Sequence, residues 1–209
     1  MSFTDKLKEE FKDVWAQAVD HKFVKQLYDG SVPDEVMKYY LIQDYKFVDT
    51  FLALVGMAVA TADTLEARLR YCRFLGMCAS DENTYFEKAL EELGASKEEQ
   101  DKTAPSRGTK AIEVIMRRTI ESNNYGAVVA VLYVAEGVYL DWAMKAPKPL
   151  PEKFIHSEWI RLHDNPDFRD YVGFLKSELD RVGPSEPLVK EFFKANVEAE
   201  RDFFDSLYD

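Results

Sequence analysis

The segment from Tyr125 to Leu140 constrains the fold more than any other part of this chain. It reads YGAVVAVLYVAEGVYL, and Glu136 is the only charged residue in it. A helix that is apolar on nearly every side belongs in the middle of a protein, between other helices. Stability alone rarely places a carboxylate there, because desolvating it without a partner costs several kcal/mol. Glu136 is therefore the first candidate for a chemical role.

The rest of the 209-residue chain also follows a helical pattern. We find no sustained apolar–polar alternation bounded by turns, which would be typical of strands. The expected helix starts are Ser2, Pro33 and Ser96, and the expected ends are Gly30, Gly94, PKPLP at 147–151 and VGPSEP at 182–187. The sequence predicts a single all-α domain over residues 1–209, a bundle of about seven or eight helices joined by short loops, several of them of about 20 residues or more.

Composition and charge argue against several classes of partner. Lys and Arg total 27 against 38 Asp and Glu, a formal net charge of −11, and no long basic run occurs. A nucleic-acid partner is not expected, because binding a phosphate backbone needs a concentrated basic surface. The run 125–140 is shorter than the about 20 residues of a membrane span and contains an acid, so no membrane partner is expected. The N-terminus MSFTDKLKEE lacks the apolar core of a signal peptide, so we expect a cytoplasmic location.

The cysteines and histidines give no recognisable metal motif. Cys72 and Cys78 lie six residues apart on one predicted helix, point in different directions and are interpreted as small buried residues. Neither belongs to a CxxC pair. None of His21, His156 and His163 follows a glutamate by three positions, as the Glu-x-x-His motif of di-iron bundles requires. We expect no metal and no cofactor, while one irregular metal site and a haem bound through His21 stay open at this point.

Three acidic residues lie on the apolar stripes of three different predicted helices. At about 100° per residue, apolar side chains within about 60° of one direction surround Asp44, Glu136 and Glu200. A single inward acid usually pairs with a buried arginine or caps a neighbouring helix. Three on separate stripes, with no basic residue among the stripe positions, make an internal polar pocket an equally good explanation. Unpaired carboxyl groups in such a pocket should have raised pKa values, which suits acid–base chemistry near neutral pH.

Three further segments carry a family resemblance. Residues 21–51 read HKFVKQLYDGSVPDEVMKYYLIQDYKFVDTF, residues 158–168 read EWIRLHDNPDF, and residues 200–205 read ERDFFD. In this order they resemble the TenA family of thiamin-salvage proteins, whose signatures include H-x-F-V…G-x-[LV]-P…Y-x-x-Q-D-x-x-[YF] and E-x-x-F-[WF]-D. The resemblance covers essentially the whole chain. It implies a haem-oxygenase-like helical fold and a homo-oligomer.

The resemblance also implies roles for individual residues. Asp44 falls on the acid that holds the aminopyrimidine ring, and Phe47 on an aromatic residue of the same pocket. His163 lies where thiaminase-type members have a tyrosine near the ligand, and Glu200 matches the family's proton donor and acceptor. Glu136 corresponds to the nucleophilic cysteine of thiaminase-type members, and neither cysteine of this chain is expected near it. The chain therefore resembles the cysteine-lacking branch, which argues against thiamin cleavage by an attacking thiolate.

These observations predict a thiamin-salvage hydrolase that acts on the aminomethyl or formylaminomethyl arm of a degraded pyrimidine. Asp44 would orient the ring, Glu136 would activate water or hold the arm, and Glu200 would pass a proton to the leaving nitrogen. The candidates for contacting the ring or arm are Tyr45, Phe47, Tyr133, Tyr139 and His163. A non-catalytic pyrimidine-binding or regulatory protein, a thiaminase-type hydrolase and an oxidase of the same fold remain alternatives.

Overall fold

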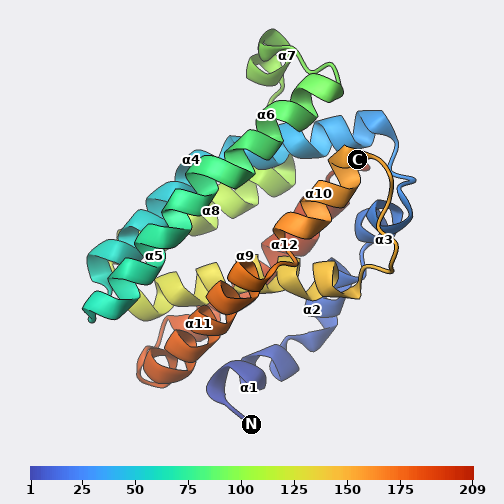
Figure 1. The fold of residues 1–209 in the computed structure, drawn as a ribbon. Coiled ribbons are helices and arrows are strands. Elements are labelled where there is room, and N and C mark those ends of the chain that lie inside the picture. Colours follow the sequence, from blue (N-terminus) through green and yellow to red (C-terminus); the bar gives the residue numbers. More distant parts are fainter.

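The computed structural model describes residues 1–209 as a single bundle of helices without strands (Figure 1). The elements are α1 (Phe3–Glu10), α2 (Lys12–Val19), α3 (Lys22–Asp29), α4 (Asp34–Thr61), α5 (Leu65–Met77), the π-helix η1 (Cys78–Glu82), α6 (Asn83–Glu92), α7 (Lys97–Lys102), α8 (Arg107–Ser122), α9 (Tyr125–Lys145), α10 (Phe154–Leu162), α11 (Pro166–Val182), the 3-10 helix η2 (Gly183–Ser185) and α12 (Val189–Asp205). The predicted all-α, single-domain fold is confirmed.

The structure has more and shorter helices than the sequence predicted. Only α4, with 28 residues, and α9, with 21, reach the expected length of 20. The first predicted helix is interrupted at Phe11, where α1 ends and α2 begins, and η1 separates α5 from α6 without a loop. No glycine or proline lies at the first break, and Gly76 just before the second was not interpreted as a helix end, so the predicted helices continued through both.

The helix ends that do carry such signals lie where the sequence predicted them. The hydroxyl groups of Ser2 and Ser96 cap the N-termini of α1 and α7 by accepting backbone N–H groups. Gly30 ends α3 in the left-handed conformation at φ 73°, which glycine adopts without a steric penalty. Pro33 directly precedes α4. Pro33 thus marks the start of the helix that carries Asp44.

Helix α9 is the central element and packs against α2, α4, α8, α11 and α12. Figure 1 shows it crossing the direction of α4 and α5. The helix continues beyond residue 140, through Asp141, to Lys145, and by length and composition it is long and apolar enough to cross a membrane, so the prediction that this segment is too short for a membrane span was wrong. However, 83% of its most apolar 18-residue segment is buried inside the protein, so other helices already cover it.

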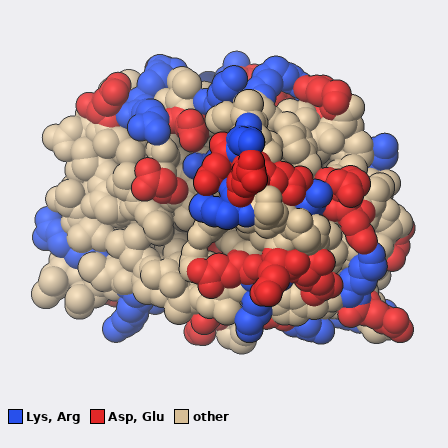
Figure 2. Space-filling view, turned by 90° about the horizontal axis from the view of Figure 1, so that it is seen from above, with Lys and Arg blue, Asp and Glu red and all other residues tan.

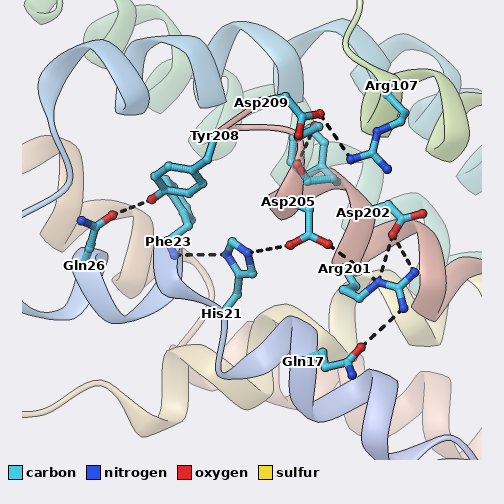
Figure 3. Close-up of polar contacts among 12 residues, drawn as sticks. Gln17, His21, Phe23, Gln26, Arg107, Arg201, Asp202, Asp205, Tyr208 and Asp209 are labelled. Atoms are coloured by element: carbon cyan, nitrogen blue, oxygen red, sulfur yellow. Dashed lines mark hydrogen bonds and ion pairs between the residues drawn. The ribbon is translucent and has the colours of Figure 1, made fainter.

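Polar contacts fix the outer face of α12 against the N-terminal helices (Figure 3). His21 caps α3 by accepting the Phe23 N–H at 3.1 Å on Nδ1, and its Nε2 lies 3.2 Å from Asp205. Arg201 forms an ion pair with Asp202 at 2.6 Å on the same outer face. Both ring nitrogens of His21 are thus engaged, which makes it a structural residue and removes the argument for a haem ligand. These contacts hold α12 in the orientation in which Glu200 points into the bundle.

Charged side chains of both signs lie on the face shown in Figure 2, whose left half is mostly uncharged. Acidic groups gather around its middle, and basic groups lie between and around them without forming a continuous patch. This distribution agrees with the formal net charge of −11.

Candidate active site

A cavity of about 50 Å³, partly open to solvent, lies where α4, η1, α8, α9, α10 and α12 meet. It is lined by Asp44, Phe47, Val48, Phe51, Glu82, Met116, Ala135, Glu136, Tyr139, Trp159, His163 and Glu200. Four of these side chains are carboxylic acids, and none is a lysine or arginine. We call this cavity the inner chamber.

The three acids selected by helical spacing come together in the inner chamber. Asp44 on α4, Glu136 on α9 and Glu200 on α12 retain only 5%, 7% and 2% of their surface exposure. None of the three takes part in an ion pair, and the nearest elements contribute apolar or acidic side chains instead. The helical period was sufficient to identify them, because each helix turns one stripe toward the same point.

Glu82 is a fourth acid of the chamber that the sequence reasoning missed. It ends the π-helix η1, and such local widenings of a helix are frequent at functional sites. A signal was present, because Cys78, Tyr85 and Phe86 lie four before, three after and four after Glu82, all on the face that is buried. Applying the helical period of about 100° per residue to residues 78–86 places Glu82 on this buried face.

Desolvation without a lysine or arginine nearby raises the pKa of all four carboxyl groups, of which those of Asp44, Glu136 and Glu200 belong to buried residues and that of Glu82 to a half-buried one. Desolvation raises the pKa of Glu200 to about 8 and that of Glu82 to about 7, while the Cys78 thiol partly opposes the rise at Glu82. Desolvation, reinforced by the neighbouring carboxylates, holds the pKa of Asp44 and of Glu136 well above the usual range. Near neutral pH the chamber therefore retains protons and can act both as acid and as base.

His163 faces the inner chamber as a neutral hydrogen-bond acceptor. Its Nδ1 lies 2.9 Å from the Trp159 carbonyl oxygen, which can only accept, so Nδ1 carries the proton. Burial lowers the pKa of His163 to about 4, so the ring is neutral near pH 7. This tautomer leaves Nε2 with a lone pair and adds an acceptor to the four carboxyl groups.

Aromatic residues hold one wall of the chamber in place. The Trp159 indole N–H donates to the Tyr40 hydroxyl at 3.0 Å, and the Tyr40 and Tyr139 hydroxyls lie 3.1 Å apart. The Tyr40 hydroxyl also favours the charged form of Asp44, which opposes the rise of its pKa. Phe47 lies on α4 with its ring edge toward Phe203 at 5.4 Å. Phe47, Tyr139 and His163 thus line the chamber.

Tyr45 and Tyr133, predicted to contact the ligand, do not line the inner chamber. Tyr45 lies about 100° around α4 from Asp44 and turns toward α6, where its hydroxyl donates to Asn83 at 2.7 Å. Tyr133 packs between Trp15 and Phe193, with ring centroids 6.2 Å from each. Because α9 is buried on all sides, a residue at the edge of the Glu136 stripe contacts other helices instead of the cavity.

Cys78 corrects the expectation that neither cysteine lies near Glu136. It is buried at the start of η1, and Glu82 and Glu136 both raise the pKa of its thiol, after desolvation as the largest cause. The thiol is therefore protonated, unlike the thiolate that nucleophilic attack requires. Cys72 is exposed, so the prediction that both cysteines are buried was wrong. No three His, Cys, Asp or Glu side chains lie close enough together to hold a metal ion.

Comparisons with known proteins identify relatives over the full length. The model of the TENA/THI-4/PQQC family matches residues 8–209. A protein of Halalkalibacterium halodurans named aminopyrimidine aminohydrolase is 22% identical over 216 residues, covering 100% of this chain and 96% of the relative. A Bacillus subtilis protein of the same name is 24% identical over 172 residues, covering 82% of this chain and 73% of the relative.

Solved structures show the same fold. A TenA homologue of P. horikoshii OT3 superposes with a TM-score of 0.88 at 23% identity, covering 100% of this chain and 99% of the other. A Shewanella denitrificans domain of unknown function, described as having a heme oxygenase-like fold, gives a TM-score of 0.71 at 15% identity, covering 98% and 91%. The predicted haem-oxygenase-like fold is confirmed.

Proposed function

Because this chain belongs to the TENA/THI-4/PQQC family, as its sequence motifs predicted, we propose that it is an aminopyrimidine hydrolase of thiamin salvage. Three curated relatives carry the name aminopyrimidine aminohydrolase. The observation that carries the proposal is the inner chamber itself, in which four carboxyl groups meet without any cation. Such a site is costly for stability, and it gains a counter-charge only when a cationic or strongly hydrogen-bond-donating ligand enters.

The chemistry of the lining favours an aminomethyl arm over a formylaminomethyl arm. The carboxylates and the Nε2 atom of His163 are acceptors, and a protonated amine offers up to three N–H donors to them. A formyl arm has only one N–H donor, and its oxygen would need a donor, which only a protonated carboxyl group or the Tyr139 hydroxyl could supply. The proposed substrate is therefore an aminopyrimidine with a free aminomethyl group.

The protonated aminomethylpyrimidine reacts with water to give the hydroxymethylpyrimidine and an ammonium ion, so that atoms and charge balance. Asp44 accepts hydrogen bonds from the amino side of the ring and fixes its orientation. Glu136 takes a proton from the attacking water, whose oxygen forms the new bond to the methylene carbon. The carbon–nitrogen bond breaks with its electron pair on nitrogen, so that ammonia leaves from the already protonated amine, and Glu200 gives the departing ammonia the proton that makes it ammonium; the proton held by Glu136 then restores Glu200. The raised pKa of Glu200, about 8, keeps it protonated for that step.

Glu136 takes the place of the thiaminase nucleophile in this proposal. Thiamin is also a cation and can enter an acidic chamber, but its cleavage would need an attacking thiolate. The one cysteine near the chamber, Cys78, is held as a thiol. Hydrolysis by activated water is therefore the better-supported reaction.

The test is to incubate the protein separately with the aminomethylpyrimidine, its formyl derivative and thiamin, and to follow products by chromatography. We expect turnover of the aminomethyl compound that disappears in Glu136→Gln, with little or no cleavage of thiamin. Tight binding without turnover of any of the three would instead identify a pyrimidine-binding protein. Bound iron required for activity would identify an oxidase.

We further propose a cytoplasmic location and a homo-oligomeric state, both in line with the family resemblance. Light scattering coupled to size-exclusion chromatography tests the second point against the protomer mass of 24.1 kDa. A single species at that mass would contradict it.

A further inference from the structure

A second cavity of about 240 Å³ adjoins the inner chamber and is several times larger. The two share Glu82, Glu136 and His163, so these three residues form the junction between them. The remaining lining of the second cavity comes from α5, η1, α10 and the start of α11: Phe74, Met77, Cys78, Asp81, Leu162, Asn165, Pro166, Asp167 and Phe168. We call this cavity the outer compartment.

The polar groups of the outer compartment are nearly all acceptors. Asp81 and Asp167 are exposed, come from opposite sides of the compartment and take part in no ion pair. No lysine or arginine lines it. The amide of Asn165 already donates to the carbonyl oxygens of Arg161 and Leu162, and its oxygen caps α11, so it offers nothing to a ligand. An anion would find no donor here.

The buried end of the compartment points to a ligand independently of these exposed acids. Glu136 is 7% exposed, lines the compartment, and has neither a hydrogen bond nor an ion pair within the protein. Glu82 lies beside it with only the Cys78 thiol as a partner. A carboxylate this deeply buried is stabilised only when a cation or a donor occupies the space it faces.

Away from the junction, the lining of the inner chamber offers no charged partner along its α4 and α8 side. Phe47, Val48, Phe51 and Met116 on that side are apolar, the first three of them half-buried. A charged product leaving that way would lose its hydration without compensation. On the way through the junction, in contrast, the ion would pass acidic side chains, first Glu82 and Glu136 and then Asp81 and Asp167.

We propose that the outer compartment is a binding site and exit route for the ammonium ion released at the junction. This inference rests on the proposed function, in which the aminomethyl nitrogen leaves as ammonium. After Glu200 has protonated the leaving nitrogen, the ion passes Glu82 at the junction, and Asp81 and Asp167 bind it at the mouth before it reaches solvent. The hydroxymethyl product stays in the inner chamber until the ion has left.

The first test measures inhibition of aminomethylpyrimidine hydrolysis by ammonium chloride, with sodium chloride holding the ionic strength constant. We expect ammonium to inhibit the wild type and the half-inhibitory concentration to rise about tenfold in Asp81→Asn/Asp167→Asn, because two charges near the ion are removed. A matched control is Asp13→Asn/Asp49→Asn, since both residues are exposed, unpaired and outside the two cavities. Equal inhibition in both double variants, or none in the wild type, would overturn the proposal.

The second test needs no catalysis and separates the two proposals. Crystals soaked in thallium(I), whose size is close to that of ammonium, should show an anomalous peak in the outer compartment that disappears in Asp81→Asn/Asp167→Asn. Turnover without this peak and without ammonium inhibition would leave the hydrolase proposal intact and refute the exit route. A peak in a protein that hydrolyses none of the three compounds would establish a cation site and refute the hydrolase.

Discussion

Gln43 and Asp44 are neighbours on α4 and both are buried, but their surroundings are opposite. The Gln43 amide nitrogen donates to the Ala104 carbonyl at 3.0 Å. Its oxygen accepts the Ser106 N–H at 2.7 Å and the Thr109 hydroxyl at 2.8 Å. Every polar atom of this side chain has a partner, and together these bonds fix α4 to the start of α8.

Asp44 has no comparable set of partners. The Tyr40 hydroxyl is the one group that favours its charged form, and Glu82 and Glu200 oppose it. A fully bonded buried side chain contributes to stability, whereas an incompletely bonded one reduces it. The comparison indicates that Gln43 is retained for the fold and Asp44 for a ligand. The predictions below test this division between a satisfied structural region and an unsatisfied functional one.

The largest effect is expected for Glu136→Gln. The amide keeps the shape of the side chain but cannot take a proton from water, so turnover should fall about 10²–10⁴-fold. The unfolding temperature should stay the same or rise, because a neutral group replaces a poorly solvated acid. Steady-state turnover and thermal unfolding of the same preparation check both points. Lost activity together with a strongly lowered unfolding temperature would place Glu136 with Gln43, among the structural residues.

The neighbouring pair on α4 gives the most direct contrast. Asp44→Asn should raise KM by about tenfold to a hundredfold, since a charged hydrogen bond to the ring is lost, without unfolding the free protein. Gln43→Ala should instead lower the free energy of unfolding by about 2–4 kcal/mol, because it leaves buried donors and acceptors without partners. Its KM should change little in the fraction that stays folded.

Ligand titration and denaturant unfolding of both variants measure this contrast. If Asp44→Asn melts the ligand-free protein while Gln43→Ala leaves its stability unchanged, the roles of the two residues are reversed.

A smaller effect is expected in the dependence of stability on pH. The pKa of Glu200 is raised from its usual 4.5 to about 8, so the folded state binds the proton more tightly than the unfolded state. The stability that the folded state gains from binding this proton is fully present below about pH 4.5 and is lost as the pH rises through about 8. The unfolding temperature of the ligand-free wild type should therefore fall between pH 5.5 and 8.5, by roughly 5 °C or more.

Glu200→Gln should flatten this decline, because the amide does not titrate. Glu121→Gln, a change at an exposed acid without a partner, is the matched control and should leave the decline as it is. Thermal unfolding at several pH values provides the measurement. A stability that rises over this range in the wild type would show that the carboxyl groups of the chamber are paired in solution.

The same contrast explains how far the sequence could predict this structure. The inward direction of Asp44, Glu136 and Glu200 follows from the helical period, which local sequence alone determines. The break at Phe11 has no glycine or proline beside it, and the break at η1 has only Gly76, so neither was predicted. Glu82 was missed because its stripe was not tested. The hydrogen bonds of Gln43 join residues more than 60 positions apart, so no local pattern could distinguish its role from that of Asp44.

The smallest effects are expected at Tyr45 and Tyr133, the two tyrosines that the sequence predicted to contact the ligand but that do not line the inner chamber. Tyr45→Phe removes one hydrogen bond to Asn83 at the partly buried edge of α4, which should cost about 1 kcal/mol of stability or less. Tyr133→Phe keeps the ring between Trp15 and Phe193 and should change stability even less. Because neither side chain lines the inner chamber, kcat and KM should both stay within about twofold of the wild type. A KM raised by tenfold in either variant would mean that the chamber widens toward that side when the ligand binds, and the boundary between structural and functional residues would then have to move.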